Sequence, residues 1–455
     1  MTTEVRPGKA AWYLIFVLTL AFTLSFVDRQ VLNLLVGPIK QDTGLSDTQV
    51  SLLQGFAFTV SYILMSPIFG RLADLGSRRK ILIFGVALWS IGTTCCGLAR
   101  NYVQLFMARF GVGGAEASLT PAAWSLITES FPERMLPRAF SIYLMGPYLG
   151  GGLALIFGGL LLDSVGSWNL SGIPLLSGLH AWQLVFILVG LPGLLVALLL
   201  VFIREPDRDD SAVLEPQTKT SLRDVWRMFV TWRGFYGNFY AGMSCIVITL
   251  YAFPAWMPTV LIRRFGASVG DVGIEYGVIV LLTGSLGVFT GPWIAKLFTT
   301  RGRVDHLLLI PTAAAAFLVF ACLSLTLINT YGWALAVASG VSFLYSLPQA
   351  LSASALQLAT PKRMRGIATA VYVFAVSIIG LGAAPTIVAL ITDRVYGDEM
   401  RVAESLAYTC AAASLAGFFF LWNSLRYFRR MIDQDLDGKL KHKSSPIIQE
   451  ETKTD

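Results

Sequence analysis

Long stretches of apolar residues, separated by short polar loops, recur along the whole chain. Each stretch has about 20 residues or more, the length that an α-helix needs to cross the hydrocarbon core of a bilayer. The twelve stretches lie at about 12–38, 48–73, 80–99, 101–127, 138–162, 181–203, 235–262, 272–297, 306–328, 331–357, 366–391 and 402–427. The pattern therefore predicts an all-α integral membrane protein with twelve transmembrane helices.

The composition agrees with this pattern. Of the 455 residues, 55% are hydrophobic and 14% are charged, whereas soluble domains carry about 25% charged residues. The net charge of +7 could suggest nucleic acid binding, but its placement argues against it. When the loops are assigned alternately to the two sides, 27 of the 35 Lys and Arg residues share the side of both termini, 6 lie on the other side and 2 lie within the membrane. Because basic residues gather on the cytoplasmic side, we expect both termini to be cytoplasmic.

The longest polar interruption divides the apolar stretches into six and six. We therefore expect an N-terminal six-helix bundle at 1–203, a cytoplasmic linker at 204–234, a C-terminal six-helix bundle at 235–428 and a mobile cytoplasmic tail at 429–455.

The two halves are weakly similar in sequence. The segment 44–70 resembles 266–291, and Pro-Glu-Arg-Met at 132–135 recurs as Pro-Lys-Arg-Met at 361–364. Two six-helix pseudo-repeats around a cavity at the bilayer midplane are the architecture of alternating-access transporters.

Four charged residues, Asp28, Arg29, Arg109 and Glu116, lie inside the apolar stretches. A charge at mid-bilayer costs several kcal/mol unless it faces a partner or water, so it marks an ion or substrate pathway. Arg109 and Glu116 are seven residues apart, which places them on one helix face about 10 Å apart along the axis. The side chains of Asp28 and Arg29 point about 100° apart around the helix axis, so only one of them can face a central cavity directly.

These spacings suggest how a proton could be coupled to transport. Apolar surroundings favour the neutral form of a carboxylic acid and a nearby arginine favours the charged form, so changing their distance would load and release a proton. We expect Glu116, or failing it Asp28, to be the protonatable group. Arg109 and Arg29 would be charge partners or ligands of an anionic headgroup, because the guanidinium fork binds phosphate in a bidentate manner. A static salt-bridge network between the two helices is the structural alternative.

The second half has no acidic or basic residue at mid-membrane. It offers polar and aromatic side chains instead, namely Tyr251, Trp256, Tyr345, Gln349, Ser352, Gln357 and Tyr372. We predict substrate contacts for Tyr345, Gln349, Tyr372 and Trp256, with helix packing as the alternative for the aromatic residues. A charged half beside a polar-aromatic half suits an amphiphile, and it also suits an organic anion.

Glycine spacing and missing motifs complete the sequence-based expectations. Gly146 with Gly150, and Gly287 with Gly291, form small-residue faces that we expect to pack between the two halves. The chain has no phosphate loop ending in Gly-Lys-Ser or Gly-Lys-Thr, so ATP hydrolysis is not expected to drive it. We expect no enzyme activity, no cofactor and no metal site, since the three histidines show no ligand or acid–base spacing.

The segment GRLADLGSRRK at 70–80 resembles the loop signature of the major facilitator superfamily. The resemblance implies that Gly70, Asp74, Arg78 and Arg79 belong to a gate that latches the two halves together on the cytoplasmic side. Gly70 would allow close packing at the helix end. Leu75 stands where the superfamily usually has an arginine, which implies a weaker latch.

Three further segments, FVDRQVLN at 26–33, QVSLLQGFAF at 49–58 and ARFGVGGAEAS at 108–118, resemble the Spinster family within that superfamily. The resemblance is specific over about 20–135. It implies a monomeric secondary transporter that moves an amphiphilic lipid, such as a lysophospholipid or sphingoid phosphate, by alternating access. The short loops and tails imply a bacterial protein of the inner membrane. Proton coupling is our expectation, with uniport, a proton-coupled organic-anion or drug transporter, and a lipid sensor without net transport as alternatives.

Overall fold

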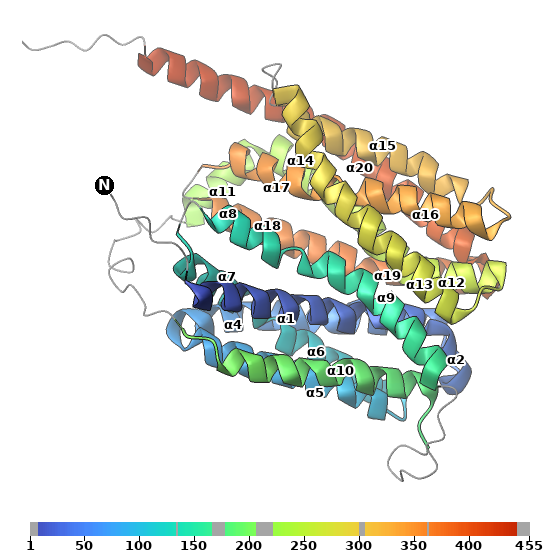
Figure 1. The fold of residues 1–455 in the computed structure, drawn as a ribbon. Helices are drawn as coiled ribbons and strands as arrows, with labels where there is room; N and C mark the ends of the chain where they lie inside the picture. The colour runs from blue at the N-terminus through green and yellow to red at the C-terminus, as the bar shows by residue number, and fades with distance from the viewer. Residues whose placement is uncertain are drawn as a thin grey trace, which may run out of the picture.

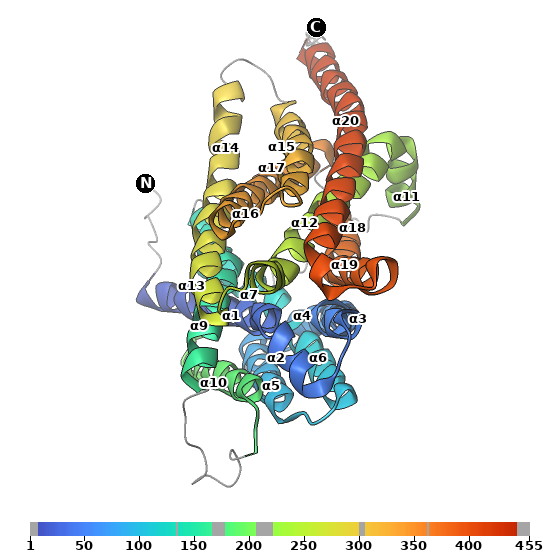
Figure 2. The ribbon, with the colours of Figure 1, turned by 90° about the vertical axis from the view of Figure 1, so that its right-hand side faces the viewer.

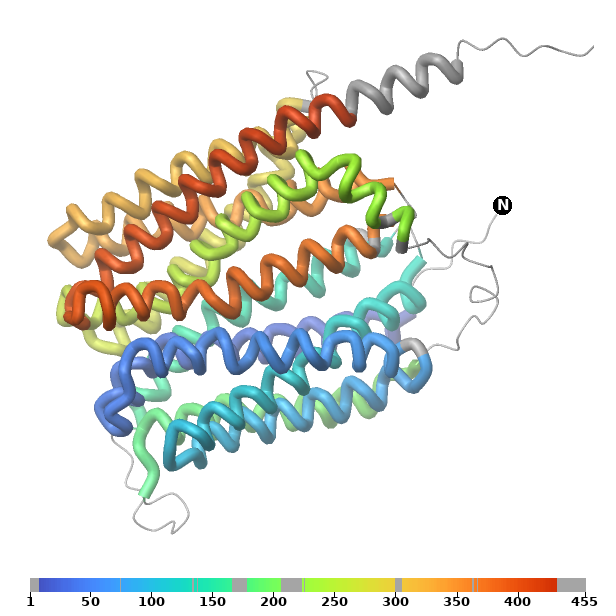
Figure 3. Tube along the Cα trace, turned by 180° about the vertical axis from the view of Figure 1, so that it is seen from behind, coloured from blue at the N-terminus to red at the C-terminus, as the bar shows by residue number. Residues whose placement is uncertain are grey.

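The computed structural model describes residues 8–132, 135–165, 178–205, 222–299, 305–361 and 364–443. All regular structure in these ranges is helical, and the long helices run side by side (Figure 1). Helix α1 (Lys9–Leu34) begins, and helix α20 (Val402–Lys443) ends, on the same side of the bundle (Figures 1 and 3). We call this the terminal side and the opposite side the far side.

The remaining elements fall into an N-terminal and a C-terminal half. The N-terminal half contains α1, α2 (Val36–Thr43), α3 (Asp47–Ser51), η1 (Leu52–Phe56), α4 (Ala57–Leu75), α5 (Arg78–Leu98), α6 (Tyr102–Glu116), α7 (Leu119–Ser130), α8 (Leu136–Tyr143), α9 (Gly146–Val165) and α10 (Ala181–Val201). The C-terminal half contains α12 (Arg233–Phe265), α13 (Val269–Ile279), η3 (Val280–Gly284), α14 (Ser285–Thr299), α15 (His306–Ser324), α16 (Tyr331–Ser346), α17 (Pro348–Ala359), α18 (Arg365–Val376), η5 (Ser377–Ala383), α19 (Ala384–Leu390), η6 (Ile391–Tyr396), η7 (Glu399–Arg401) and α20. Helix α11 (Leu222–Thr231) precedes α12.

The twelve predicted spans are all present as helices. Within the described ranges, 11 helical spans are long and apolar enough to cross a membrane. The twelfth consists of α6 and α7, which a turn at Ala117 and Ser118 separates, so that neither piece is long enough alone. The predicted borders of the linker and the tail stay predictions, and 206–221 and 444–455 lie outside the described residues.

The predicted internal repeat is visible in the caps of two corresponding helices. Gly44 adopts the left-handed conformation (φ 68°) after α2, and Ser46 then caps α3; Gly266 (φ 67°) and Ser268 repeat this arrangement between α12 and α13. Glycine is favoured at such positions because it has no Cβ. The two Pro-x-Arg-Met turns are each closed by a backbone hydrogen bond of 2.8 Å, although their two middle residues lie outside the described ranges.

Helix α9 of one half runs beside α13 of the other (Figures 1 and 2), and glycines of the two helices face each other there. A Cβ atom at Gly273 would lie 2.6 Å from the carbonyl oxygen of Leu155 and 2.9 Å from the Cα atom of Gly159. A Cβ atom at Gly277 would lie 2.9 Å from the carbonyl oxygen of Gly152. Small residues permit this backbone-to-backbone contact between helices.

The glycines that we predicted for the interface between the halves pack elsewhere. Gly146 and Gly150 face Phe22, Thr23 and Phe26 of α1, and Gly287 and Gly291 face the end of α16 and Leu347. Each pair therefore packs within its own half, and the prediction was wrong. Sequence spacing shows that a helix has a small-residue face, but it does not show which neighbour that face meets.

We expect Gly273→Ala to lower the melting temperature of the purified protein in detergent. The added methyl group would collide with the backbone of α9, and such overpacking costs about 1–3 kcal/mol. Gly340→Ala is the matched control, since a Cβ atom there would meet nothing within 4 Å. A Gly273→Ala protein as stable as the wild type would contradict the close packing of α9 against α13.

Candidate functional site

The four predicted intramembrane charges gather where α1, α6 and the second span meet. The Arg109, Glu116 and Asp28 side chains are all buried, and Arg29 is nearly so. Arg109 and Glu116 project from one face of α6, as their spacing predicts. The Asp28 carboxyl group interacts electrostatically with Glu116, Arg109 and Arg29. The structure therefore brings all four residues into one cluster.

An ion pair between Arg29 and Glu116 joins α1 to α6. Arg29 Nε and Nη2 both donate to Glu116 Oε2, at 2.8 and 2.5 Å. The Glu116 side chain is 0% exposed and that of Arg29 is 14% exposed. The guanidinium group also lies over the Phe58 and Phe26 rings, 4.4 and 4.7 Å from their centroids. These cation–π contacts hold the planar group in place where water is scarce.

Arg109 binds backbone rather than a carboxylate. Its Nε donates to the carbonyl oxygen of Leu53 (3.3 Å) and its Nη1 donates to that of Asp28 (3.0 Å). Leu53 belongs to the π-helical segment η1, whose wider turn shifts the regular pairing of backbone groups. One guanidinium group thus connects three spans. The sequence predicted Arg109 as a charge partner or headgroup ligand, and this backbone contact was not predicted.

The cluster contains polar atoms that remain unsatisfied. Among the described residues, neither Asp28 Oδ1, Glu116 Oε1 nor Arg109 Nη2 has a hydrogen-bond partner. A buried polar atom without a partner carries a large desolvation cost. The two carboxylate oxygens can accept a proton or a hydrogen bond, and the arginine nitrogen can donate a hydrogen bond to a polar ligand.

A cavity of about 180 Å³ lies between the two halves, next to this cluster. Phe26 and Gln30, which flank Arg29 in α1, line it from the N-terminal half. Tyr345 and Gln349, two of the residues predicted to contact substrate, line it from the C-terminal half. The other polar or aromatic lining residues are Tyr148, Tyr251 and Ser346. Their roles in substrate binding stay predictions.

Two other predicted contacts lie outside this cavity. Trp256 is fully buried, and its Nε1 donates to the carbonyl oxygen of Pro385 (2.9 Å), which joins α12 to α19. The Tyr372 ring packs against the rings of Phe239 and Tyr240, with centroids 5.7 and 6.2 Å away. Both side chains therefore support the packing alternative in this arrangement.

An apolar groove of about 330 Å³ lies between the fifth and eighth spans. Leu144, Met145 and Leu149 line it on one side, and Val288 and Phe289 line it on the other. The side chain of Tyr148 lines both this groove and the central cavity. The two spaces are thus neighbours, and an apolar surface adjoins the polar centre.

The residues of the predicted terminal-side gate connect helices within the N-terminal half. Arg78 pairs with Glu129 and Glu205, and Arg79 Nη1 donates to the carbonyl oxygen of Ile203 (3.2 Å). Burial raises the pKa of the Glu205 carboxyl group, but hydrogen bonds from Ser77 and Arg78 outweigh burial, so the pKa is lowered overall. These contacts fix α5 to the ends of α7 and α10.

The other gate residues add little to this picture. A Cβ atom at Gly70 would meet no heavy atom within 4 Å, so the close packing expected there is not found among the described residues. The Asp74 side chain lies outside the described ones. A latch between the halves at this side stays a prediction.

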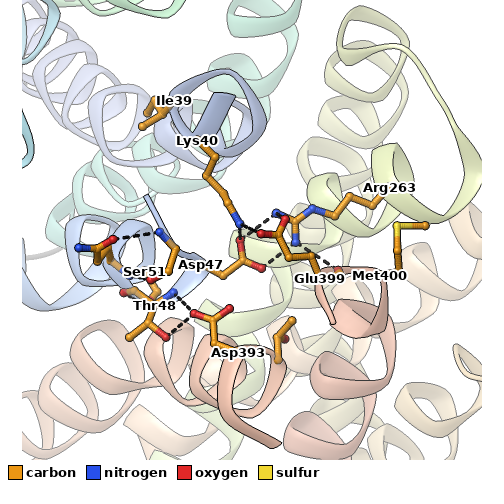
Figure 4. A network of polar contacts seen from close by, with 12 residues as sticks. Ile39, Lys40, Asp47, Thr48, Ser51, Arg263, Asp393, Glu399 and Met400 are labelled. Atoms are coloured by element: carbon orange, nitrogen blue, oxygen red, sulfur yellow. Dashed lines mark hydrogen bonds and ion pairs between the residues drawn. The ribbon is translucent and has the colours of Figure 1, made fainter. Parts of the chain in front are cut away.

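An ionic network does join the two halves on the far side (Figure 4). The Asp47 carboxylate, which is 0% exposed, accepts from Lys40 Nζ at 2.5 Å and from Arg263 Nη1 and Nη2 at 2.7 and 2.8 Å. Glu399 pairs with Lys40 (2.6 Å) and with Arg263 (3.2 Å). Because Lys40 and Asp47 belong to one half and Arg263 and Glu399 to the other, we call these four residues the far-side latch.

Two further contacts join the halves near this latch. Asp393 Oδ2 accepts from the backbone N–H (2.8 Å) and the hydroxyl group (2.6 Å) of Thr48 (Figure 4), so a carboxylate of one half sits at a helix N-terminus of the other, where negative charge is favoured. Gln54 Nε2 donates to the carbonyl oxygen of Ala255 (3.3 Å) and to Asn33 Oδ1 (3.1 Å). These contacts between the halves were not predicted from the sequence, because they join residues that are more than 200 positions apart in the chain.

Within the described ranges, no cluster of three or more His, Cys, Asp or Glu side chains is arranged to hold a metal ion. A cavity lies between two helical halves, next to a buried ion pair, and charged pairs join these halves on the far side. This arrangement is typical of alternating-access carriers.

Comparison with known proteins agrees with this geometry. The family model of the Major Facilitator Superfamily matches residues 18–385. An MFS-type efflux pump of Mycolicibacterium smegmatis is 28% identical, over 94% of this chain and 95% of its own length. Protein spinster homolog 1 of Xenopus tropicalis is 28% identical, over 88% of this chain and 78% of its own. The crystal structure of a bacterial homolog of the human lysosomal transporter Spinster, inward-facing and occupied, superposes with a TM-score of 0.75 at 26% identity, covering 95% of this chain and 99% of the other.

The chain is thus a multi-pass membrane transporter and not an enzyme. It belongs to the major facilitator superfamily, as the loop motif at 70–80 indicated. The matches to Spinster proteins confirm the resemblance seen in the first, second and fourth apolar stretches.

We expect Asp47→Asn to open the far side. The change leaves Lys40 and Arg263 without their shared carboxylate, and removing one partner of a buried ion pair costs about 3–5 kcal/mol. Spin labels at Gln41 and Arg394, both exposed on the far side, would report longer distances between the halves in pulsed electron paramagnetic resonance. The native cysteines are first replaced.

Asp42→Asn is the control for this experiment. Asp42 is also a far-side carboxylate, but its partners Trp182 and His180 lie in the same half. In the Asp42→Asn protein, the distances between the two spin labels should match those of the labelled protein without this substitution. Unchanged distances in Asp47→Asn would show that the latch does not hold the halves together.

Proposed function

We propose that the protein is a secondary active transporter that moves an amphiphilic lipid with an anionic headgroup by alternating access, coupled to protons. A lysophospholipid or sphingoid phosphate is the substrate class that fits best. The observation that carries this proposal is the junction at Tyr148, where the apolar groove adjoins the cavity beside Arg29 and Glu116. A lipid could keep its acyl chain in the groove while its headgroup reaches the charged centre.

The arrangement of the Arg29–Glu116 pair supports proton coupling. Both hydrogen bonds from Arg29 end on one carboxylate oxygen of Glu116. A proton added to Glu116 removes the negative charge that holds the guanidinium group, and Arg29 is then available to an anionic headgroup. Release of the headgroup lets the pair form again as the proton leaves, which ties substrate movement to proton movement.

The distribution of basic residues supports an orientation in the membrane. We place both termini, and hence the terminal side, in the cytoplasm of a bacterial cell, with the protein as a monomer in the inner membrane. The latch then lies on the outer side and the cavity belongs to an inward-facing conformation. The similarity to the inward-facing Spinster homolog supports this assignment.

Export of drugs or small organic anions is the second candidate function. The similarity to the Mycolicibacterium smegmatis efflux pump, which extends over 94% of this chain, favours it. A water-soluble anion would use Arg29 in the same way but would not need the apolar groove. This difference makes the two candidates separable by experiment.

We expect Glu116→Gln to abolish gradient-driven uptake of a labelled lysophospholipid into proteoliposomes. The amide has the size of the carboxyl group but cannot lose a proton, so a pH gradient would no longer accelerate uptake. Glu275→Gln, which removes an exposed carboxylate of α13, should keep the response. Uptake that ignores both the gradient and Glu116→Gln would indicate a uniporter, and binding without accumulation would indicate a lipid sensor.

Val288→Trp should reduce uptake of the lysophospholipid at least about tenfold, because the indole would fill the groove and exclude the acyl chain. A tenfold loss corresponds to about 1.4 kcal/mol of binding free energy. Uptake of a small organic anion should stay unchanged. Ala313→Trp, on an exposed position of α15, is the control. Equal losses for both substrates would argue against a separate lipid path through the groove.

A further inference from the structure

Helix α11, which leads into α12 on the terminal side, has an apolar face that is only partly covered. Met228 is 9% exposed and accepts a hydrogen bond from the Tyr236 hydroxyl group at its sulfur atom (3.6 Å). The Phe229 ring lies 4.9 Å from the Tyr236 ring. Trp226, three residues before Phe229 on the same face, is 71% exposed. An amphipathic helix with an exposed tryptophan at the end of a transmembrane helix is typical of the membrane–water interface.

Trp226 forms one wall of an apolar groove of about 710 Å³. This volume lies within the roughly 300–1,000 Å³ of typical ligand pockets. Figures 1 and 2 both place α11 beside α18, which supplies the opposite wall. The lining residues are Trp226, Phe229, Arg233, Tyr236, Gly237, Tyr240, Ile367 and Val371. The groove is separate from the central cavity, with which it shares no lining residue.

Two arginines are associated with this groove. Arg233 lines it, and Arg227 directly follows the lining residue Trp226 in the chain. Both are exposed, and within the described part of the chain neither takes part in a hydrogen bond or an ion pair. An apolar groove lined by Arg233, with Arg227 next to its lining residue Trp226 in the chain, matches the two parts of an anionic phospholipid. Acyl chains need apolar walls, and arginine binds phosphate strongly.

We propose that this groove is a binding site for one anionic phospholipid of the terminal-side leaflet. The acyl chain lies along α12 and α18, and the phosphate accepts hydrogen bonds from Arg227 and Arg233. The site does not depend on which substrate is transported. Only the turn at Trp232 separates α11 from α12, and α12 also lines the central cavity through Tyr251. A lipid bound here therefore restrains the terminal end of a cavity-lining helix.

Quenching of Trp226 fluorescence tests the proposal directly. The full chain is placed in nanodiscs of phosphatidylcholine that contain a minor share of brominated phosphatidylglycerol or brominated phosphatidylcholine. The difference between the wild type and Trp226→Phe isolates the signal of Trp226 from the other ten tryptophans. Brominated phosphatidylglycerol should be enriched at Trp226 about fivefold if one arginine's attraction is realised.

Three pairs of substitutions test whether the arginines cause this preference. Arg227→Gln with Arg233→Gln should lower the ratio of the two lipids to about one, by removing the electrostatic attraction. Arg100→Gln with Arg394→Gln, which removes two exposed arginines of the far side, should leave it unchanged. Arg227→Lys with Arg233→Lys keeps the charge, so it should keep most of the preference and serves if the glutamine pair fails to fold.

Three results would overturn the proposal. Equal quenching by the two lipids would mean that the groove holds ordinary, unselected boundary lipid. A preference that survives in the glutamine pair would mean that other charges attract the phospholipid. Absence of quenching by either lipid would mean that protein covers the groove.

Discussion

Charge that is buried away from water must be satisfied by the protein itself, and the centre of this transporter is organised by that constraint. Arg109 donates to backbone carbonyls of two neighbouring spans, and Arg29 donates twice to Glu116. These bonds tie the first, second and fourth spans into one unit. The π-helical turn at Leu53 also helps to satisfy the buried charge, because its carbonyl oxygen accepts a hydrogen bond from Arg109. Among the described residues, Arg109 has no carboxylate partner.

The two halves are held together by contacts of different kinds at different depths. Glycine backbones touch between α9 and α13, Gln54 reaches a carbonyl of α12, and the far-side latch supplies charged pairs. The terminal-side arginines Arg78 and Arg79 bind within one half instead. The cavity is therefore bounded by interactions that cross the interface on one side and by interactions that stay within a bundle on the other.

The sequence predicted the fold well because its signals are local. Apolar length determines each span, and the charged residues in the first and fourth spans are costly enough to require one another, so their clustering was predictable. The glycine faces and Trp256 show where this reasoning stops. Periodicity identifies a small or aromatic face, but the neighbour of that face is set by the packing of distant helices. The bond from Arg109 to a π-helical carbonyl and the partners of Asp47 depend on the same long-range geometry.

The duplicated halves have the same fold, yet they no longer share their chemistry. All four intramembrane charges belong to the N-terminal bundle, whereas the C-terminal bundle contributes the uncharged cavity residues Tyr251, Tyr345, Ser346 and Gln349. Substitutions on the uncharged side can reshape the cavity without disturbing the Arg29–Glu116 pair. The residues that shape the cavity from the C-terminal half are thus separate in sequence from the ion pair, so a change in the cavity surface and a change in the charged cluster require different substitutions.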